Sequence, residues 1–434
     1  MREVDILLKN CDIITVNTSG EVIRKGCLAV DNGTIVAIGD EETAAQFSGK
    51  TNIKNRIVCP GFVNAHTHIA MAYFKGLADD IDLHTWLNRY IWPAESHWLS
   101  DEFVYNSSLH GIAELLLNGV TTFNDMYFHS RSTARAAQKA GIRAVLGEGV
   151  VDFPLKLHPN STSMIDYAVA ASKEYAPRIQ FAIAPHAVYT CGATSWEVAF
   201  QAARDNGLQL HYHLAETKKE VEDAREALGT TPVRYLYKNG WLGKNVTAAH
   251  CVWLEDEEIE MLAESGTSVA INTKSNLKLA SGFAPVVKLL KAGVNVCIGT
   301  DSVASNNNLS ILEELSITSR LHKTLNNDPT CLPADQMLRL ATINGAKALG
   351  LEKQTGSLEV GKAADLVLFS SDSIEAQPIY SPVSHLVYTL NSSNITDVFI
   401  EGEAVLKNRK LVNLDTCEIL EKAVRYSALI KGKK

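Results

Sequence analysis

The sequence has no long hydrophobic run, no excess of positive charge and no closely paired cysteines. No uninterrupted apolar stretch approaches the roughly 18 residues of a membrane-spanning helix. Residues 1–5 lack the cationic start and apolar core of a signal peptide. The formal net charge of −8 provides no electrostatic footprint for nucleic acid. We therefore expect a cytoplasmic protein that binds neither a membrane nor nucleic acid.

The eight cysteines exclude further kinds of site. None of them stands in a C-x-x-C pair, and most lie in apolar segments. A cysteine-rich zinc site and the P-C-x-x-C signature of one class of zinc deaminases are therefore disfavoured. Reduced thiols in the core of a cytosolic protein are the better interpretation.

The chain does contain a regular alternation of short apolar segments and helical patterns. Eight candidate strands follow one another, at 57–64, 120–126, 143–151, 179–186, 208–214, 246–251, 267–272 and 294–300. The gaps carry helical patterns such as 103–118 and 335–349, and a glycine follows several of them. Eight alternating units predict an α/β fold with a parallel (β/α)₈ barrel of the TIM type.

Both ends of the chain have a different pattern, of short strands and turns. Residues 5–16 and 27–38 come first, the latter with Asn32-Gly33 at its centre, which is a strong hairpin signal. Residues 364–369 and 398–406 return to this pattern near the end. We predict a small β-sandwich domain built from residues 1–56 and 355–434, with the catalytic barrel at 57–354 inserted between them. A length of 434 residues suits one barrel with an accessory domain.

Several of the apolar segments end in histidine or aspartate. His66 and His68 close the first, and His213, His250 and Asp301 close three others. A (β/α)₈ barrel places its reactive side chains at such strand ends. A lone H-x-H would more often be a polar strand end, but the whole set favours a metal site. Imidazoles with one carboxylate suit Zn²⁺, and Fe²⁺ or Mn²⁺ remain open.

Other residues near these strand ends suggest the chemistry. Asp301 could bind the ion and accept a proton from water, or it could instead cap a helical turn at 302–308. Glu216, three residues after His213, could protonate a ring nitrogen, or it could be a solvated loop residue. His186 ends the fourth strand and is a candidate for contact with substrate.

The chain resembles the amidohydrolase superfamily, in particular its 5′-methylthioadenosine/S-adenosylhomocysteine deaminases and the related triazine chlorohydrolases. The resemblance covers essentially the whole chain. The matching stretches are residues 60–68, 124–128, 184–186, 213–217, 249–252, 275–282, 299–307 and 356–367.

The resemblance implies one divalent metal ion per subunit, for which we expect Zn²⁺. Its ligands would be His66, His68, His213 and Asp301. His250 would orient the water molecule that attacks, and Asp301 would take its proton. Glu216 would protonate N1 of adenine, so that oxygen adds at C6 and ammonia leaves.

The resemblance also suggests substrate-binding residues. Glu95 matches the glutamate that binds the ribose hydroxyls in nucleoside-deaminase relatives. Trp86 resembles an aromatic wall beside it, and His186 a residue that touches the purine or ribose. Glu148 stands where relatives that accept S-adenosylhomocysteine have an arginine, so we expect 5′-methylthioadenosine or adenosine to be preferred. Residues 271–274 also depart from the family, which puts the shape of that loop in doubt.

Two alternatives remain open. The first is hydrolysis of another amino- or chloro-substituted heterocycle, such as guanine or an s-triazine; Glu95 disfavours a triazine, which has no ribose. The second is a barrel scaffold without catalysis, which the full set of candidate ligands disfavours. We expect a small nucleoside as the binding partner and a homo-oligomer as the assembly.

Overall fold

The computed structural model describes residues 1–175 and 177–432. The described chain contains two compact units. The first consists of residues 1–63, 113–122 and 310–414, and the second of residues 64–112, 123–309 and the chain from Asp415 onward. The boundaries expected from the sequence, which assign 57–354 to the barrel, stay a prediction.

Eight strands form one sheet in sequential order, as predicted for a barrel. They are β6 (Phe62–Thr67), β7 (Val120–Tyr127), β8 (Arg143–Val150), β9 (Ile179–Pro185), β10 (Gln209–Leu214), β11 (Val246–His250), β12 (Ser268–Ile271) and β13 (Val296–Ile298). The pairs from β8 to β13 are parallel. Just beyond β13, the Asp301 amide donates to the carbonyl of His66 on β6 at 3.0 Å. This bond brings the two edges together, and the (β/α)₈ barrel is confirmed.

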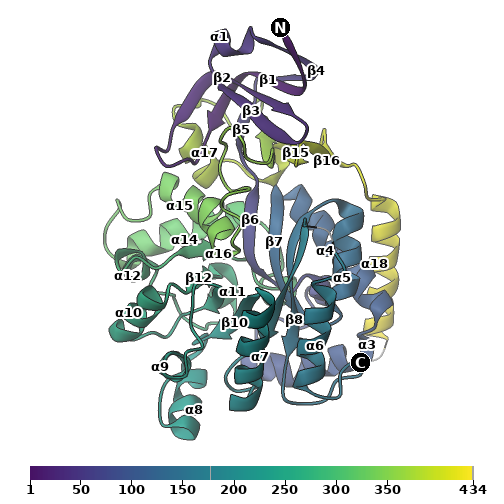
Figure 1. Cartoon of the computed structure of the whole chain (residues 1–434), viewed down its shortest axis with the longest axis vertical. Coiled ribbons are helices and arrows are strands. Elements are labelled where there is room, and N and C mark those ends of the chain that lie inside the picture. Colours follow the sequence, from purple (N-terminus) through teal and green to yellow (C-terminus); the bar gives the residue numbers. More distant parts are fainter. Residues whose placement is uncertain (176, 433–434) are drawn as a thin grey trace. The chain divides into compact units, whose positions relative to one another are not determined.

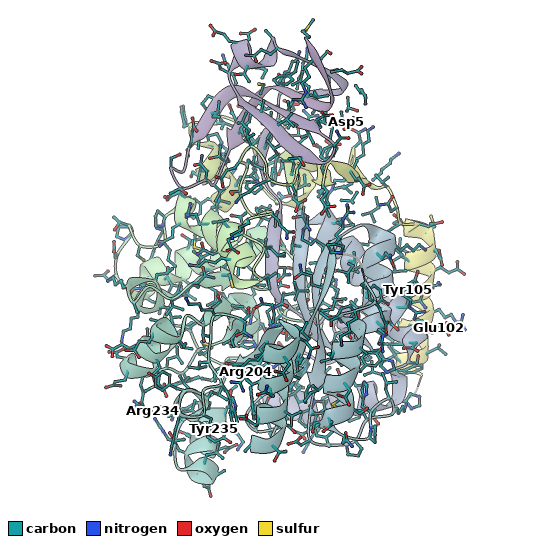
Figure 2. The ribbon with its side chains drawn as sticks, in the orientation of Figure 1. Asp5, Glu102, Tyr105, Arg204, Arg234 and Tyr235 are labelled. Carbon is teal, nitrogen blue, oxygen red and sulfur yellow. The ribbon has the colours of Figure 1, made fainter. Side chains whose placement is uncertain are left out.

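Helices follow the barrel strands, as Figure 1 shows for α5, α6 and α7. This group comprises α5 (Ser130–Ala140), α6 (Ser161–Ala171), α7 (Ala193–Asn206), α8 (Lys218–Leu228), α9 (Pro232–Lys238), α10 (Asp256–Ser265), α11 (Thr273–Lys278), α12 (Val286–Lys291) and α13 (Val303–Asn306). Gly141 and Gly207, two of the glycines that follow helical patterns in the sequence, end α5 and α7 in the left-handed conformation. On α9, Arg234 is labelled in Figure 2; it pairs with Glu255 at 2.8 Å on the solvent side.

A long insertion follows β6. It contains the 3₁₀ helix η1 (Ile69–Phe74), α2 (Leu83–Trp86), the π-helix η2 (Leu87–Ile91), α3 (Trp92–Trp98) and α4 (Asp101–Leu117). The C-terminal helix α18 (Thr416–Lys431) packs against this region. The ring of Tyr426 stacks on that of Tyr73, with 5.0 Å between the ring centroids, and packs edge to face with that of Phe103 at a centroid distance of 5.3 Å. These ring contacts hold the apolar side of the insertion against α18.

The two chain ends share a second sheet of nine strands, as predicted. Its strands are β1 (Arg2–Ile14), β2 (Val22–Asp31), β3 (Thr34–Gly39), β4 (Phe47–Lys54), β5 (Ile57–Pro60), β14 (Leu366–Phe369), β15 (Ile395–Ile400), β16 (Glu403–Lys407) and β17 (Lys410–Leu411). Asn32 and Gly33 have φ values of 48° and 72°. Two positive φ values in succession are typical of the type I′ turn that joins β2 to β3.

The remaining helices of the first unit include one that the sequence predicted as continuous. They are α1 (Glu41–Ala44), α14 (Ile311–Leu325), α15 (Ala334–Leu340), α16 (Ile343–Ala348), α17 (Pro382–Tyr388) and η3 (Ser392–Asn394). The helix predicted at 335–349 is divided into α15 and α16 at Thr342, whose backbone leaves the helical region with φ −133° and ψ −94°. Its hydroxyl donates to the carbonyl of Leu338 at 2.6 Å.

The apolar run predicted as one strand at 57–64 is also divided. β5 pairs with β1 and β14 in the nine-stranded sheet, whereas β6 belongs to the barrel. Gly61 lies between them and donates its amide to the carbonyl of Asp365 at 2.9 Å. A β-carbon at Gly61 would lie 2.0 Å from the hydroxyl of Thr121, so only glycine fits this crossing.

All eight cysteines are free thiols, in agreement with the sequence analysis. Among the described residues, no helix combines the length and the apolar character that crossing a membrane requires.

Candidate metal centre and active site

A cavity of about 400 Å³ opens in the second unit. Eight of the predicted site residues line it: His68, Trp86, Glu95, His186, His213, Glu216, His250 and Asp301. His66 lies in the same cluster and is fully buried. Glu148 is not among the lining residues.

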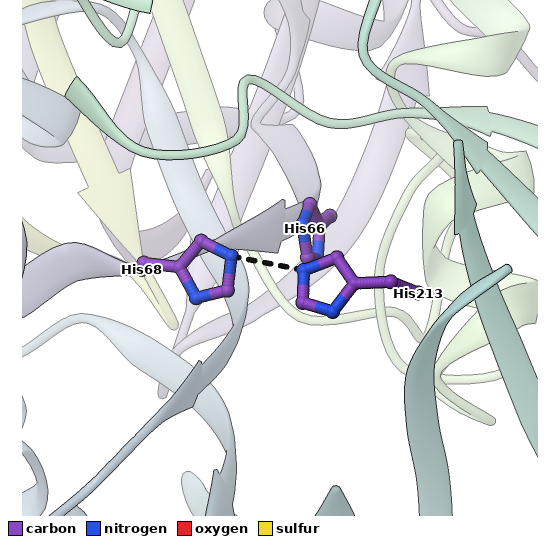
Figure 3. Close-up of side chains that lie close together, drawn as sticks. All are labelled: His66, His68 and His213. Carbon is purple, nitrogen blue, oxygen red and sulfur yellow. Dashed lines mark hydrogen bonds between the residues drawn. The ribbon is translucent and has the colours of Figure 1, made fainter. Parts of the chain in front are cut away.

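His68 and His213 turn the same ring atom toward each other. The Nδ1 atom of His68 lies 2.6 Å from the carbonyl oxygen of Met126, and Nδ1 of His213 lies 2.8 Å from that of His186. Because a carbonyl only accepts, each neutral ring carries its proton on Nδ1 and its lone pair on Nε2. The two Nε2 atoms are 3.2 Å apart, along the dashed line in Figure 3. Lone pairs that face each other at this distance repel unless a cation lies beside both.

His66 adds a third nitrogen to this point, and Asp301 adds an oxygen. The Nδ1 atom of His66 lies 2.8 Å from Nε2 of His211, and the buried Nε2 atom of His66 has no hydrogen-bond partner among the described residues. Oδ1 of Asp301 lies 3.5 Å from Nε2 of His66 and 3.3 Å from Nε2 of His68. One nitrogen from each of three histidines and one carboxylate oxygen therefore converge.

The donor set fits a divalent metal ion. The ligand atoms of His66, His68 and His213 lie within 4.8 Å of one another, as do those of His66, His250 and Asp301. With bonds of about 2.0–2.1 Å, neighbouring ligands of a tetrahedral Zn²⁺ are about 3.3 Å apart. The separations of 3.2–3.5 Å agree with that spacing. Burial lowers the pKa of His66 and His213, which keeps both rings in the neutral form that binds metal.

Asp301 is held by three hydrogen bonds. The hydroxyls of Ser275 and Ser305 donate to Oδ2 at 2.6 and 2.9 Å, and the amide of Ser302 donates to Oδ1 at 2.7 Å. Three donors on one carboxyl group favour its ionised form. The alternative role as a helix cap belongs to Ser302, whose side chain accepts from Ser305 at the start of α13.

His250 differs from the other histidines in its hydrogen bonding. Its Nδ1 atom faces the side-chain amide nitrogen of Asn276 at 3.0 Å and that of Asn272 at 3.4 Å. Because an amide nitrogen donates, Nδ1 accepts and the ring proton lies on Nε2. That nitrogen points toward Glu216, with 3.7 Å between Nε2 and Oε2. His250 is therefore arranged to donate a hydrogen bond, whereas His68 and His213 present lone pairs.

Glu216 is 6% exposed, and hydrogen bonds to the backbone of its turn set its position. Glu220 of α8 accepts from the amides of Ala215 and Glu216, at 3.0 and 2.8 Å. Ala215 adopts a left-handed φ of 49° at this turn. Burial, with the charges of Asp301 and Glu220, raises the pKa of Glu216 well above its usual value. A raised pKa favours the protonated carboxyl group, which is the form that a proton donor must have.

The other side of the cavity carries the predicted substrate-binding residues. Glu95 of α3 accepts a hydrogen bond from the Tyr127 hydroxyl at 2.7 Å, and burial raises the pKa of Glu95 to about 7. Trp86 of α2 is 5% exposed. His186 follows β9; its Nδ1 lies 3.0 Å from the hydroxyl of Thr190, and burial lowers its pKa to about 3.

Glu148, and Lys274 of the divergent segment 271–274, lie elsewhere. Both oxygens of Glu148 are engaged: they accept from the backbone amides of His129 and Ser130 at 3.0 and 2.8 Å, at the start of α5. Nε2 of His158 lies 3.2 Å from Oε1 of Glu148. Lys274 bonds the side chain of Asn308 and does not line the cavity.

Sequence reasoning missed several residues that support the site. His211 contacts the ring of His66, and Tyr127 donates to the carboxylate of Glu95. Glu220 accepts from the backbone amide of Glu216. Asp125 accepts from the Thr67 hydroxyl and the Ile69 amide, both at 2.7 Å, and so fixes the turn that carries His68. Only His211 carried a usable signal, because residues 211 and 213 point to the same side of one strand.

The sequence matches the amidohydrolase family over residues 57–405. A protein of Thermodesulfovibrio yellowstonii named 5-methylthioadenosine/S-adenosylhomocysteine deaminase is 41% identical, with 97% of each chain covered. A 5′-deoxyadenosine deaminase of Methanosarcina mazei is 40% identical, with 96% of each chain covered. The crystal structure of an adenosine deaminase from Xanthomonas campestris with bound zinc superposes with a TM-score of 0.97 at 35% identity, covering 99% of each chain. Atrazine chlorohydrolase from Arthrobacter aurescens, with zinc, shares the fold at 24% identity and a TM-score of 0.91, covering 97% of this chain and all of its own.

Proposed function

The chain belongs to the amidohydrolase family, and on that premise we propose that it is a metal-dependent deaminase of adenosine-type nucleosides. It would replace the 6-amino group by oxygen and release ammonia, with 5′-methylthioadenosine as the preferred substrate and adenosine or S-adenosylhomocysteine as further candidates. The observation that carries the proposal is geometric: the buried Glu216 lines the cavity at which the ring nitrogens of His66, His68 and His213 converge.

The metal would be held by His66, His68, His213 and Asp301, with Zn²⁺ as the expected ion and one ion per subunit. A bound Zn²⁺ lowers the pKa of water and thereby supplies a nucleophile at neutral pH. The relatives named above support this proposal, since the adenosine deaminase structure contains zinc.

The side chains of the cavity would divide the proton transfers between them. Nε2–H of His250 donates a hydrogen bond that orients the attacking water, and the ionised Asp301 accepts a proton from it. Glu216 donates its proton to N1 of the purine as the water oxygen adds at C6. Asp301 passes the proton that it accepted to the amino group, the C6–N bond breaks and ammonia leaves. The C6 hydroxyl gives its proton back to Glu216, and a C6 carbonyl remains.

The substrate would lie with its purine at the metal-binding residues and its sugar at Glu95. Trp86 and His186 line the same cavity and would contact the sugar or the base. The expected discrimination by Glu148 against a substrate carboxylate also remains a proposal, and it would act from outside the cavity wall.

The alternative substrates are not favoured. Curated relatives at about 40% identity are named nucleoside deaminases, whereas the triazine hydrolase shares only the fold. A scaffold without catalysis is disfavoured by the polar groups gathered in the cavity. The homo-oligomeric state and the cytoplasmic location expected from the sequence remain predictions.

The proposal is tested by a spectrophotometric assay of the adenine-to-hypoxanthine change on zinc-loaded protein. We expect rapid turnover of 5′-methylthioadenosine and a loss of about 10²- to 10⁴-fold in kcat for Glu216→Gln, which removes the proton donor but leaves the metal ligands. Metal content is measured on both proteins. Absence of turnover on 5′-methylthioadenosine, adenosine and S-adenosylhomocysteine, in protein that holds zinc, would contradict the proposed function.

A further inference from the structure

Tyr127 connects the two halves of the cavity. It is the last residue of β7, 4% exposed, and lines the cavity beside Glu95, which is 9% exposed. Its hydroxyl donates to Oε1 of Glu95 at 2.7 Å. The proposed reaction uses Glu95 to bind the sugar and gives Tyr127 no part.

The end of β7 holds residues on both sides of the cavity. The carbonyl of Met126 fixes the His68 ring through Nδ1 at 2.6 Å, and the next residue, Tyr127, fixes Glu95. The rings of Tyr127 and His68 lie 6.4 Å apart between centroids. One rigid strand end thus sets the spacing between the proposed reaction centre and the proposed sugar-binding carboxylate.

The hydrogen bond also restricts which acceptor positions Glu95 can offer. A carboxylate without a fixed donor rotates about its terminal bond, because that torsion has a broad energy profile. Tyr127 holds Oε1, which leaves Oε2 and the remaining lone pairs to accept from a ligand. A ligand that presents two neighbouring hydroxyls can donate two hydrogen bonds to such an anchored carboxylate.

We propose that Tyr127 is a positioning residue that orients Glu95 toward a vicinal diol, so that selectivity for ribonucleosides over dideoxynucleosides depends on its hydroxyl. This inference rests on the proposed function, which places the sugar at Glu95. It assigns to the phenol a share of the discrimination between sugars, beyond satisfying a buried carboxylate.

The test is Tyr127→Phe, assayed with adenosine and with 2′,3′-dideoxyadenosine. The variant keeps the ring and removes only the donor. We expect kcat/KM for adenosine to fall about tenfold, chiefly through KM, because a Glu95 carboxylate without its fixed donor loses about one hydrogen bond to the diol, and one such bond contributes about that factor to binding. For the dideoxy substrate, kcat/KM should change by less than about twofold. The ratio of kcat/KM for adenosine to kcat/KM for the dideoxy substrate should therefore fall about five- to tenfold.

Tyr73→Phe is the matched control. Tyr73 is also a buried tyrosine of the same unit, its hydroxyl has no hydrogen-bond partner among the described residues, and it does not line the cavity. In the Tyr73→Phe variant, the ratio of kcat/KM for adenosine to kcat/KM for the dideoxy analogue should equal that of the unmodified protein. Zinc content and thermal unfolding are measured on both variants.

Two results would overturn the inference: an equal loss on both substrates, which is the signature of a structural role, or no loss on either. Glu95→Gln separates this failure from failure of the proposed sugar site. If Glu95→Gln retains the preference for adenosine over the dideoxy analogue, the sugar does not bind at Glu95, and both proposals fall. If Glu95→Gln loses the preference and Tyr127→Phe retains it, only the role of Tyr127 is wrong.

Discussion

At the scale of single residues, the partner of each imidazole Nδ1 atom decides what the opposite nitrogen can do. Carbonyl oxygens face Nδ1 of His68 and His213, whereas an amide nitrogen faces Nδ1 of His250. The first arrangement directs a lone pair into the site and the second directs a proton. Histidines that look equivalent in the sequence are therefore divided into proposed ligands and a proposed hydrogen-bond donor.

His211 should control metal affinity through the same effect. When His66 binds through Nε2, its Nδ1 proton needs an acceptor, and Nε2 of His211 lies 2.8 Å away. His211→Phe removes that acceptor, and we expect zinc affinity to fall about 10- to 100-fold. Competition with a chromophoric chelator measures the affinity directly. His211→Gln should lose less because its amide oxygen can accept; equal, unaltered affinity in both variants would refute this role.

At the scale of elements, the turn between β10 and α8 aims the proposed proton donor. Both oxygens of Glu220 accept from consecutive backbone amides, those of Ala215 and Glu216. Glu220→Gln retains one acceptor oxygen and places an amide group against the other donor. We expect kcat to fall about 10- to 100-fold with little change in KM, because a small displacement of Glu216 misaligns the transfer to N1.

The measurement for Glu220→Gln is steady-state kinetics with zinc content determined for each preparation. Glu222→Gln is a suitable control, since Glu222 lies exposed on the same helix and pairs with Lys218 at 3.2 Å. An equal fall in kcat in both variants, or a loss of bound zinc in Glu220→Gln, would show that the turn supports the fold rather than the orientation of the Glu216 side chain.

The elements also show what the sequence could reveal. Strand ends were predictable because a buried strand is an apolar run, and the polar residue that follows marks its end. The division at Gly61 was not, since Cys59 and Phe62 are equally buried in different sheets. Contacts such as Tyr127 with Glu95 join segments whose spacing depends on strand register and on the path of the insertion. Neither is encoded in local periodicity.

At the scale of the whole molecule, stability should depend on a histidine remote from the proposed chemistry. His322 lies on α14 in the first unit and is 4% exposed. Burial lowers its pKa from 6.5 to about 4. The folded state therefore favours the neutral ring, whereas the unfolded chain protonates it near pH 6.5.

The sign of the pH dependence follows from that difference. The stability contributed by the neutral ring is fully present above pH 6.5 and is lost as the pH falls from 6.5 toward about 4. The fall in the pKa of His322 from 6.5 to about 4 corresponds to about 3 kcal/mol. His322→Gln cannot be protonated, so its thermal-unfolding midpoint should fall less than that of the unmodified protein over this window, whatever their difference at pH 7. Calorimetry from pH 7 to pH 4 measures both curves, with His84→Gln, at an exposed position, as the control. Parallel curves for the unmodified protein and His322→Gln would show that protonation of His322 is not linked to unfolding, and the acid sensitivity of the fold would then lie in other buried groups.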